Sequence, residues 1–144
     1  MSQIPERYSI SDGSHGRPCV LIVDDEVSVR AAMMRYFARR GWDVCEAEDG
    51  EAATRVLAPN VAASFTLVIC DLRMPSFSGV ELYQWLLRAR PDVIDRLVFS
   101  TGDTECLETV AFLREVRRPV LAKPFELVEL ARIVDAANTS ARAA

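Results

Sequence analysis

The sequence is poor in the residues that build most metal centres. Its 144 residues include one histidine, His15, and four cysteines, of which no two are separated by only two residues. Zinc sites need clusters of cysteine and histidine, so no zinc site is expected. Cys45 and Cys70 lie in apolar runs and are predicted to be small buried hydrophobic side chains rather than disulfide partners. His15 lies in a polar segment, where a solvated surface residue is far more common than a phosphodonor.

Long hydrophobic runs are also missing, as is a signal-peptide pattern at the start. No apolar stretch approaches the ~20 residues that a transmembrane helix needs, so no membrane association is expected and a cytoplasmic location is the default. The formal net charge of −4 does not indicate binding to nucleic acid or to an acidic membrane surface. The length is sufficient for one domain with its own core.

The apolar residues that are present form five short runs with helical patterns between them. The runs predict strands at residues 20–23, 42–47, 67–70, 97–99 and 120–122. Gly41 is a helix-stop signal, Asp49 is a predicted N-cap, and Ser78 with Glu81 is a capping-box signal. Strands that alternate with helices imply a parallel sheet with right-handed crossovers. Residues 1–17 are expected to form a flexible tail, residues 18–138 the folded domain, and residues 139–144 a frayed end.

Four of the five runs end in a polar residue of the kind that takes part in phosphoryl chemistry. The residues that follow these runs are Asp24 and Asp25, Asp71, Ser100 and Thr101, and Lys123. The carboxyl ends of parallel strands share one edge of the sheet, where ligands bind in open α/β folds. The sequence therefore predicts that three carboxylates, a hydroxyl and an ammonium group converge there.

Three carboxylates in one small volume repel one another, so at least one should have a raised pKa. A small divalent cation relieves this repulsion, and Mg2+ suits the oxygen ligands. A carboxylate can also attack phosphorus and form an acyl phosphate, with Thr101 and Lys123 as partners for the phosphoryl oxygens. The alternative is that Asp24 and Asp25 merely cap the next helix. Asp71 favours the functional interpretation, because a Pro/Gly loop rather than a helix follows it directly.

At these motifs the sequence resembles the response-regulator receiver domain of two-component signalling. The resemblance covers about residues 18–138. The matching segments are Val23-Asp24-Asp25-Glu26, Asp49-Gly50-Glu51-Ala52, Asp71-Leu72-Arg73-Met74-Pro75 with Gly79, Ser100-Thr101-Gly102 and Lys123-Pro124-Phe125, together with Gly41. Each motif alone is weak, but the combination is highly specific.

The resemblance implies a fold and a set of roles. The fold is a flavodoxin-like doubly wound α/β fold, with a five-stranded parallel sheet in the order 2-1-3-4-5 and five helices. Asp71 would be the phosphoacceptor, charged by a histidine kinase or histidine phosphotransfer protein, and Thr101 and Lys123 would contact the phosphoryl oxygens. Mg2+ would be bound by Asp25, Asp71 and the backbone carbonyl of Arg73, with Asp24 acting through water. The only chemistry implied is phosphorylation and dephosphorylation of Asp71 itself.

Two features depart from the family pattern. Val120 stands where an aromatic residue is usual, three positions before Lys123, and the usual Gly-Ala pair between the fourth helix and fifth strand is missing. Phe112-Leu113 followed by Pro119 resembles the receivers that are joined to hybrid sensor kinases, although ordinary helix packing also explains these residues. Because Arg73 and Asp103 each lie two residues after a site residue, we expect them to pair across the mouth of the site and hinder the attacking water.

Two other functions are compatible with parts of the pattern. A small-molecule phosphatase with an aspartate nucleophile would also use Asp71, Mg2+ and a lysine, but such enzymes carry a second acid where this chain has Arg73. A degenerate receiver would only bind partners. The presence of all five expected site residues argues against this alternative. No output domain is expected after the last helix, so signalling to a downstream target would proceed by protein–protein interaction.

Overall fold

The computed structural model describes residues 16–60 and 64–143. The expected tail therefore lies almost wholly outside the described residues, and so does His15. None of the helices in the described part of the chain is long and apolar enough to cross a membrane.

Five parallel strands form one sheet in the order β2-β1-β3-β4-β5, which confirms the predicted topology. They are β1 (Cys19–Val23), β2 (Asp43–Ala47), β3 (Leu67–Asp71), β4 (Leu97–Thr101) and β5 (Val120–Ala122). The chain passes outward from β1 to β2 and then returns to β3 on the other side of β1. The winding thus reverses between β1 and β3, the place where doubly wound folds bind their ligands.

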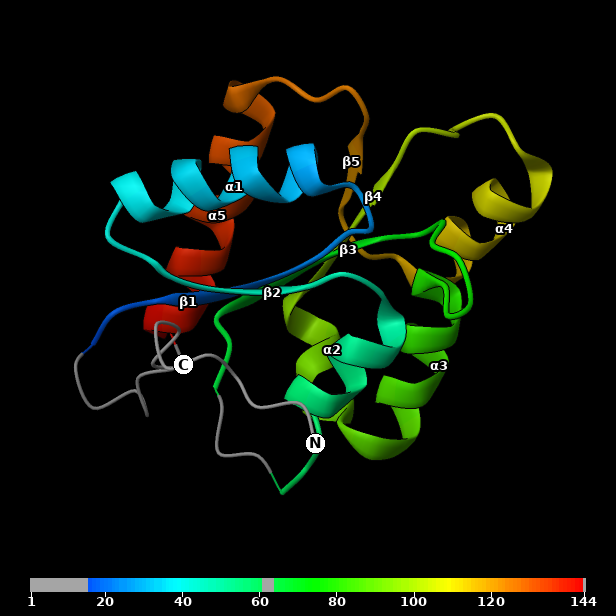
Figure 1. Ribbon diagram of the computed structural model, residues 1–144, viewed down its shortest axis with the longest axis horizontal. Coiled ribbons are helices and arrows are strands. Elements are labelled where there is room, and N and C mark those ends of the chain that lie inside the picture. The colour runs from blue at the N-terminus through cyan, green and yellow to red at the C-terminus, as the bar shows by residue number, and fades with distance from the viewer. Residues whose placement is uncertain (1–15, 61–63, 144) are drawn as a thin grey trace.

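The helices cover both faces of this sheet. They are α1 (Val27–Arg39), α2 (Gly50–Val56), α3 (Gly79–Ala89), α4 (Leu107–Val116) and α5 (Leu127–Ala143). α1 and α5 lie on one face, and α2, α3 and α4 on the other (Figure 1). A short 3-10 helix, η1 (Pro91–Arg96), was not predicted; it begins at Pro91, whose fixed φ suits a first helical position.

Side chains that alternate along each strand supply two separate cores. Leu21 and Val23 of β1 pack with the α2–α3–α4 side, whereas Val20 and Ile22 pack with the α1–α5 side. Every residue of β1, β3 and β4 is buried, as continuous apolar runs predict. Cys45 and Cys70 are buried in the first of these cores, as predicted.

The predicted helix signals are found at the expected boundaries. The Asp49 carboxylate accepts a hydrogen bond from Ala52 N at 2.8 Å, and the Ser78 hydroxyl accepts one from Glu81 N at 3.2 Å. Gly41 follows α1 with a φ of 79°, a left-handed conformation that favours glycine. α5 runs to Ala143 and so passes residue 138, where the folded domain was expected to end. Its last turns contain few large apolar residues, so the helical pattern in the sequence gives no clear end there.

Candidate functional site

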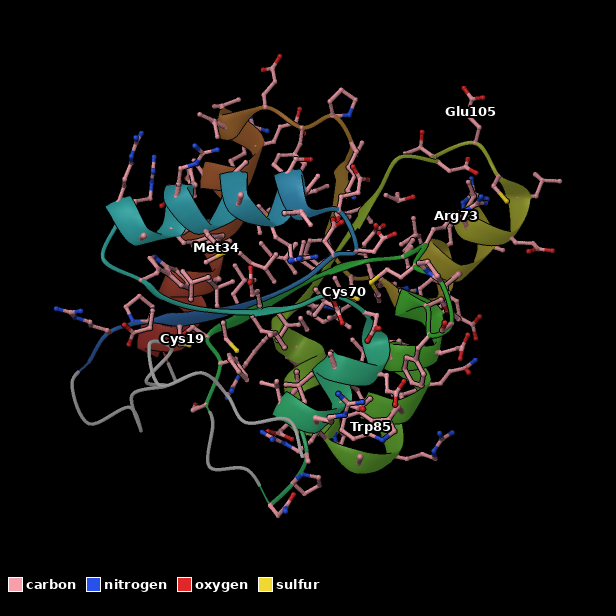
Figure 2. All side chains as sticks on the ribbon, in the orientation of Figure 1. Cys19, Met34, Cys70, Arg73, Trp85 and Glu105 are labelled. Atoms are coloured by element: carbon pink, nitrogen blue, oxygen red, sulfur yellow. The ribbon has the colours of Figure 1, made fainter. Side chains whose placement is uncertain are left out.

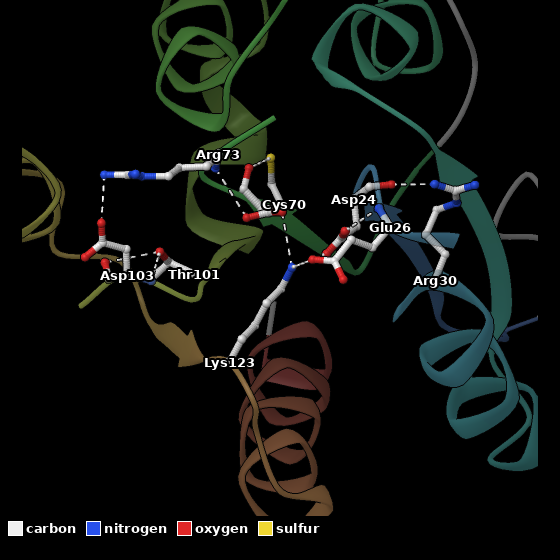
Figure 3. Close-up of polar contacts among 9 residues, drawn as sticks. Asp24, Glu26, Arg30, Cys70, Arg73, Thr101, Asp103 and Lys123 are labelled. Atoms are coloured by element: carbon white, nitrogen blue, oxygen red, sulfur yellow. Dashed lines mark hydrogen bonds and ion pairs between the residues drawn. The ribbon is translucent and has the colours of Figure 1, made fainter. Parts of the chain in front are cut away.

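The carboxyl edge of the sheet brings an ammonium group into contact with two buried carboxylates. Lys123 follows β5, and its Nζ lies 2.7 Å from Asp24 Oδ2 and 3.1 Å from Asp71 Oδ2 (Figure 3). Glu26 Oε1 lies 3.6 Å from the same Nζ. Residues from three different strand ends thus meet at one point, as the strand-end pattern predicts.

The predicted acidic cluster is also found. Asp24, Asp25 and Asp71 each offer a carboxylate oxygen, and these oxygens lie within 4.8 Å of one another. Asp24 and Asp71 are buried, whereas Asp25 is exposed. Three hard oxygen ligands beside a solvent-accessible side match the coordination chemistry of a small divalent cation such as Mg2+, so these residues fit the ion that the sequence suggests.

Asp24 is held in place by bonds to both its side chain and its main chain. Its Oδ1 accepts a hydrogen bond from Glu26 N at 2.9 Å, and its own N donates to Ala47 O at 3.1 Å. Its carbonyl oxygen accepts a hydrogen bond from Arg30 Nη1 at 2.6 Å. Asp24 therefore stabilises the turn before α1, as the capping alternative suggested, and also contacts Lys123. The two interpretations of this residue do not exclude each other.

Burial raises the pKa of the Asp71 carboxyl. The Lys123 ammonium opposes this shift, and the negative charge of Asp24 adds to it. A raised pKa in the cluster was predicted from charge repulsion, but removal from water is the larger cause. For Lys123, burial lowers the pKa, yet the hydrogen bond to Asp24 and the two nearby carboxylates raise it overall.

Thr101 is buried at the end of β4, beside the site, but its hydroxyl is hydrogen-bonded to the main chain of the turn that follows. The Thr101 Oγ1 accepts a hydrogen bond from Asp103 N at 3.1 Å and donates to Asp103 O at 3.3 Å. To donate to a group on Asp71, the hydroxyl must give up the bond to Asp103 O, although it can still accept from Asp103 N. Strand-end reasoning placed Thr101 at the correct edge, but it could not give the direction of the hydroxyl.

The expected pair between Arg73 and Asp103 is present. Arg73 Nη2 lies 2.8 Å from Asp103 Oδ2, so the loop after β3 is tied to the loop after β4 (Figure 3). Figure 2 shows Arg73 close to α4, whereas Cys70, three residues before it, lies within the body of the protein. The main-chain N of Arg73 donates to Asp71 Oδ1 at 3.3 Å. Hydrogen bonds from Cys106 N and Glu105 N to the Asp103 carboxylate, and the nearby Arg73, lower the pKa of Asp103.

Gly79 allows α3 to begin directly against the end of β3. A Cβ atom at this position would lie 2.5 Å from Asp71 O and 2.9 Å from Leu72 Cα. Only a residue without a side chain fits there, so Gly79 helps to set the path of the loop that carries Asp71 and Arg73.

One residue of the site region was missed by the sequence reasoning. Arg30 of α1 is only 12% exposed, and its Nε lies 3.6 Å from Glu46 Oε2 in β2. The only signal in the sequence is a charged residue directly after Val29, which belongs to the apolar stripe of the predicted helix. Such a residue is ordinarily interpreted as part of the solvated face.

Comparison with known proteins gives concordant matches. A profile of the family described as the response regulator receiver domain matches residues 20–135. Sensor kinase CckA of Brucella abortus is 30% identical over 119 residues, which make up 83% of this chain and 12% of that protein. Response regulator MprA of a Mycobacterium species is 34% identical over 111 residues, which make up 77% of this chain and 46% of that protein.

A solved receiver protein shares the fold over almost its whole length. The response regulator receiver protein from Pseudomonas putida is similar with a TM-score of 0.72 and 30% identity, over 83% of this chain and 97% of that one. By contrast, the chain spans less than half the length of the two curated relatives, at 12% and 46%.

Proposed function

Because the chain belongs to the response regulator receiver domain family, whose profile matches residues 20–135, we propose that it accepts a phosphoryl group on Asp71. The donor would be a phosphohistidine on a histidine kinase or a histidine phosphotransfer protein. The observation that carries the proposal is the contact of Lys123 Nζ with Asp71 Oδ2 at 3.1 Å, beside a cluster of three carboxylates. This arrangement supplies both a nucleophile and a cation for the transferred charge.

The transfer would proceed by attack of an Asp71 carboxylate oxygen on the phosphorus atom. A new O–P bond forms, the N–P bond of the phosphohistidine breaks, and the imidazole of the donor leaves. Lys123 would neutralise charge on the phosphoryl oxygens, and the Thr101 hydroxyl would donate a hydrogen bond to one of them after giving up its bond to Asp103 O. Positioning and charge stabilisation supply most of the catalysis in such transfers.

Mg2+ is the ion that the carboxylates would hold. Asp25, Asp71 and the main-chain carbonyl of Arg73 would be ligands, and Asp24 would act through water. The ion would supply positive charge to the phosphoryl group. Asp24 is in addition paired with Lys123 at 2.7 Å, so its charge is already partly balanced.

The chemistry proposed here is confined to the phosphorylation and dephosphorylation of Asp71. The downstream partner would be a protein that recognises the phosphorylated form. Histidine kinases take their phosphoryl group from cytoplasmic ATP. The proposal therefore implies a cytoplasmic location for the domain. The receiver domain would comprise residues 18–138, and α5 continues beyond residue 138 to Ala143.

A direct test is incubation with a small acyl-phosphate donor and Mg2+, followed by intact-mass measurement. The mass should rise by one phosphoryl group, and the gain should be lost in Asp71→Ala and on chelation of Mg2+. Asp95→Ala is a matched control, because Asp95 is exposed in η1 before β4, whereas Asp71 ends its strand. No gain in the wild type would indicate a degenerate receiver, and repeated turnover of phosphate esters would indicate a phosphatase.

A further inference from the structure

We propose that Arg30 is a positioning residue that holds the turn presenting Asp24 and Asp25 to a divalent cation. This inference rests on the proposed function, because it concerns the same acidic cluster. Arg30 lies in the first turn of α1, and its Nη1 donates to the carbonyl oxygen of Asp24 at 2.6 Å (Figure 3). Its side chain is only 12% exposed, so little water competes for this hydrogen bond.

The bonded carbonyl belongs to the peptide unit that joins Asp24 to Asp25. A peptide unit is planar, so a fixed carbonyl also fixes the direction of the Asp25 main chain. Asp24 itself is held at its N, its side chain and its carbonyl. Asp25 is the exposed member of the pair. The bond from Arg30 to the preceding carbonyl therefore fixes the main chain that carries this exposed carboxylate.

The far side of Arg30 is anchored as well. Its Nε lies 3.6 Å from Glu46 Oε2, and Glu46 belongs to β2, the strand next to β1. The guanidinium thus links the β1–α1 turn to a neighbouring strand. A largely buried cation needs partners for its charge and for its N–H groups, and here Glu46 balances the charge while the Asp24 carbonyl accepts from Nη1.

The sign of the expected effect separates positioning from simple electrostatics. Arg30 is a cation near a proposed cation site, so its charge alone weakens Mg2+ binding. Removing the charge should then tighten binding. If Arg30 instead holds the turn, removing it should weaken binding, and the two explanations predict opposite results.

The test is the Mg2+ dissociation constant, measured by calorimetry, for the wild type, Arg30→Met, Arg30→Lys and Arg35→Met. We expect Arg30→Met to bind Mg2+ about 10-fold more weakly, the lower end of what loss of a residue supporting metal ligands costs. Arg30→Lys keeps the charge and should show a smaller loss. Arg35→Met is the control, because Arg35 is exposed on the same helix, and its binding should be unchanged or slightly tighter.

Amide hydrogen exchange in the Mg2+-free proteins gives a second readout. The Glu26 N–H is bonded to Asp24 Oδ1 at 2.9 Å and reports on the turn directly. Its exchange should become faster in Arg30→Lys and remain unchanged in Arg35→Met, even if Arg30→Met fails to fold. Binding by the Arg30 variants that equals or exceeds that of the wild type, or unchanged exchange in Arg30→Lys, would overturn the inference. A wild type that neither binds Mg2+ nor accepts a phosphoryl group would instead overturn the proposed function.

Discussion

Arg73 is an exposed member of the site, and its side chain is 61% accessible to solvent. Its pair with Asp103 is therefore a surface ion pair, for which about 0.2–1 kcal/mol is typical. The pair could be predicted from the sequence, because each partner stands two residues after a residue at the same sheet edge. The direction of the Thr101 hydroxyl could not, because it depends on the turn at Asp103 rather than on β4.

Loss of the Arg73–Asp103 pair should shorten the lifetime of phosphorylated Asp71. The pair joins the two loops beside the phosphoacceptor and would hinder the approach of water. We expect Arg73→Ala and Asp103→Asn each to speed dephosphorylation by up to about 5-fold, in line with the energy of an exposed pair. The rate is measured by loss of the phosphoryl mass after the donor is removed.

The double variant sharpens this expectation. If the pair acts as a unit, Arg73→Ala/Asp103→Asn should be no faster than the single variants. Asp103→Asn retains an oxygen that can accept from Cys106 N, so the loop before α4 should keep its shape. Arg88→Ala removes an exposed arginine from α3 and should leave the rate unchanged. Additive effects, or no effect of either change, would contradict the role of the pair.

The four cysteines should differ sharply in reactivity. Burial raises the pKa of Cys19 to about 12 and that of Cys45 to about 11, and it also raises the pKa of Cys70. Cys106 precedes α4, and hydrogen bonds from the main-chain N–H groups of Thr109 and Glu108 lower its pKa. Because the thiolate is the reactive form, Cys106 should be alkylated first near neutral pH.

This expectation is checked by iodoacetamide labelling with peptide mapping over a range of pH. Labelling of the native protein should take place at Cys106 alone and should extend to lower pH than for an ordinary thiol. Cys106→Ser should abolish it, while all four cysteines should react after unfolding in the wild type. Early labelling of Cys45 or Cys70 would show that the sheet is less well packed than the structure indicates.

At the scale of elements, α3 depends on a glycine at its first residue. Gly79→Ala would place a methyl group 2.5 Å from Asp71 O, so the start of α3 or the end of β3 must shift. We expect a loss of about 1–3 kcal/mol in the free energy of unfolding, as for other overpacked positions. Gly102→Ala is a matched control beside the same site, because a Cβ there meets no atom within 4 Å. Equal stability of the two variants in chemical denaturation would refute this account.

α4 is the helix that the core holds least firmly. None of its residues is fully buried, and Leu107 at its start is 85% exposed. Phe112, Leu113 and Val116 attach it to the core, and the Phe112 ring packs against Phe99 of β4 and Tyr83 of α3 at centroid distances of 5.4 Å and 5.5 Å. This contact supports ordinary packing as one role of Phe112. Phe99 lies two residues before Thr101, so its contact with Phe112 joins β4 directly to α4. This contact is present in a chain that has Val120 where receiver domains usually have an aromatic residue.

Boundaries of the elements were harder to predict than their order. α1 and α3 have clear start or stop signals, and their limits follow from Gly41 and Ser78. η1 lacks a hydrophobic period that would distinguish it from a loop, and Pro91 by itself indicates the end of the preceding helix as readily as the start of a new one. The end of α5 lies in a segment with few large apolar residues, where hydrophobic periodicity gives no boundary.

At the scale of the whole molecule, the parallel sheet follows from the alternation of strands and helices, and the strand order is implied by the resemblance to receiver domains. Buried runs separated by helices predict parallel strands with right-handed crossovers, and parallel strands place every strand-end residue at one edge of the sheet. Asp71 and Lys123 are 52 residues apart in sequence, yet they meet there. What remained hidden were the contacts made by individual side chains, such as the bond from Arg30 to the Asp24 carbonyl.

The acidic cluster should also make the stability of the whole domain depend on Mg2+. A ligand that binds only the folded state stabilises it by about 2.7 kcal/mol at 100 times its dissociation constant. We therefore expect the thermal midpoint to rise on addition of MgCl2 and to return on chelation, with NaCl at equal ionic strength as the control. Asp25→Asn should fold normally, because Asp25 is exposed, and relief of repulsion should leave its Mg2+-free stability equal or higher. Its Mg2+-dependent rise should nevertheless be largely lost. A rise in Asp25→Asn equal to that of the wild type would show that the ion binds elsewhere.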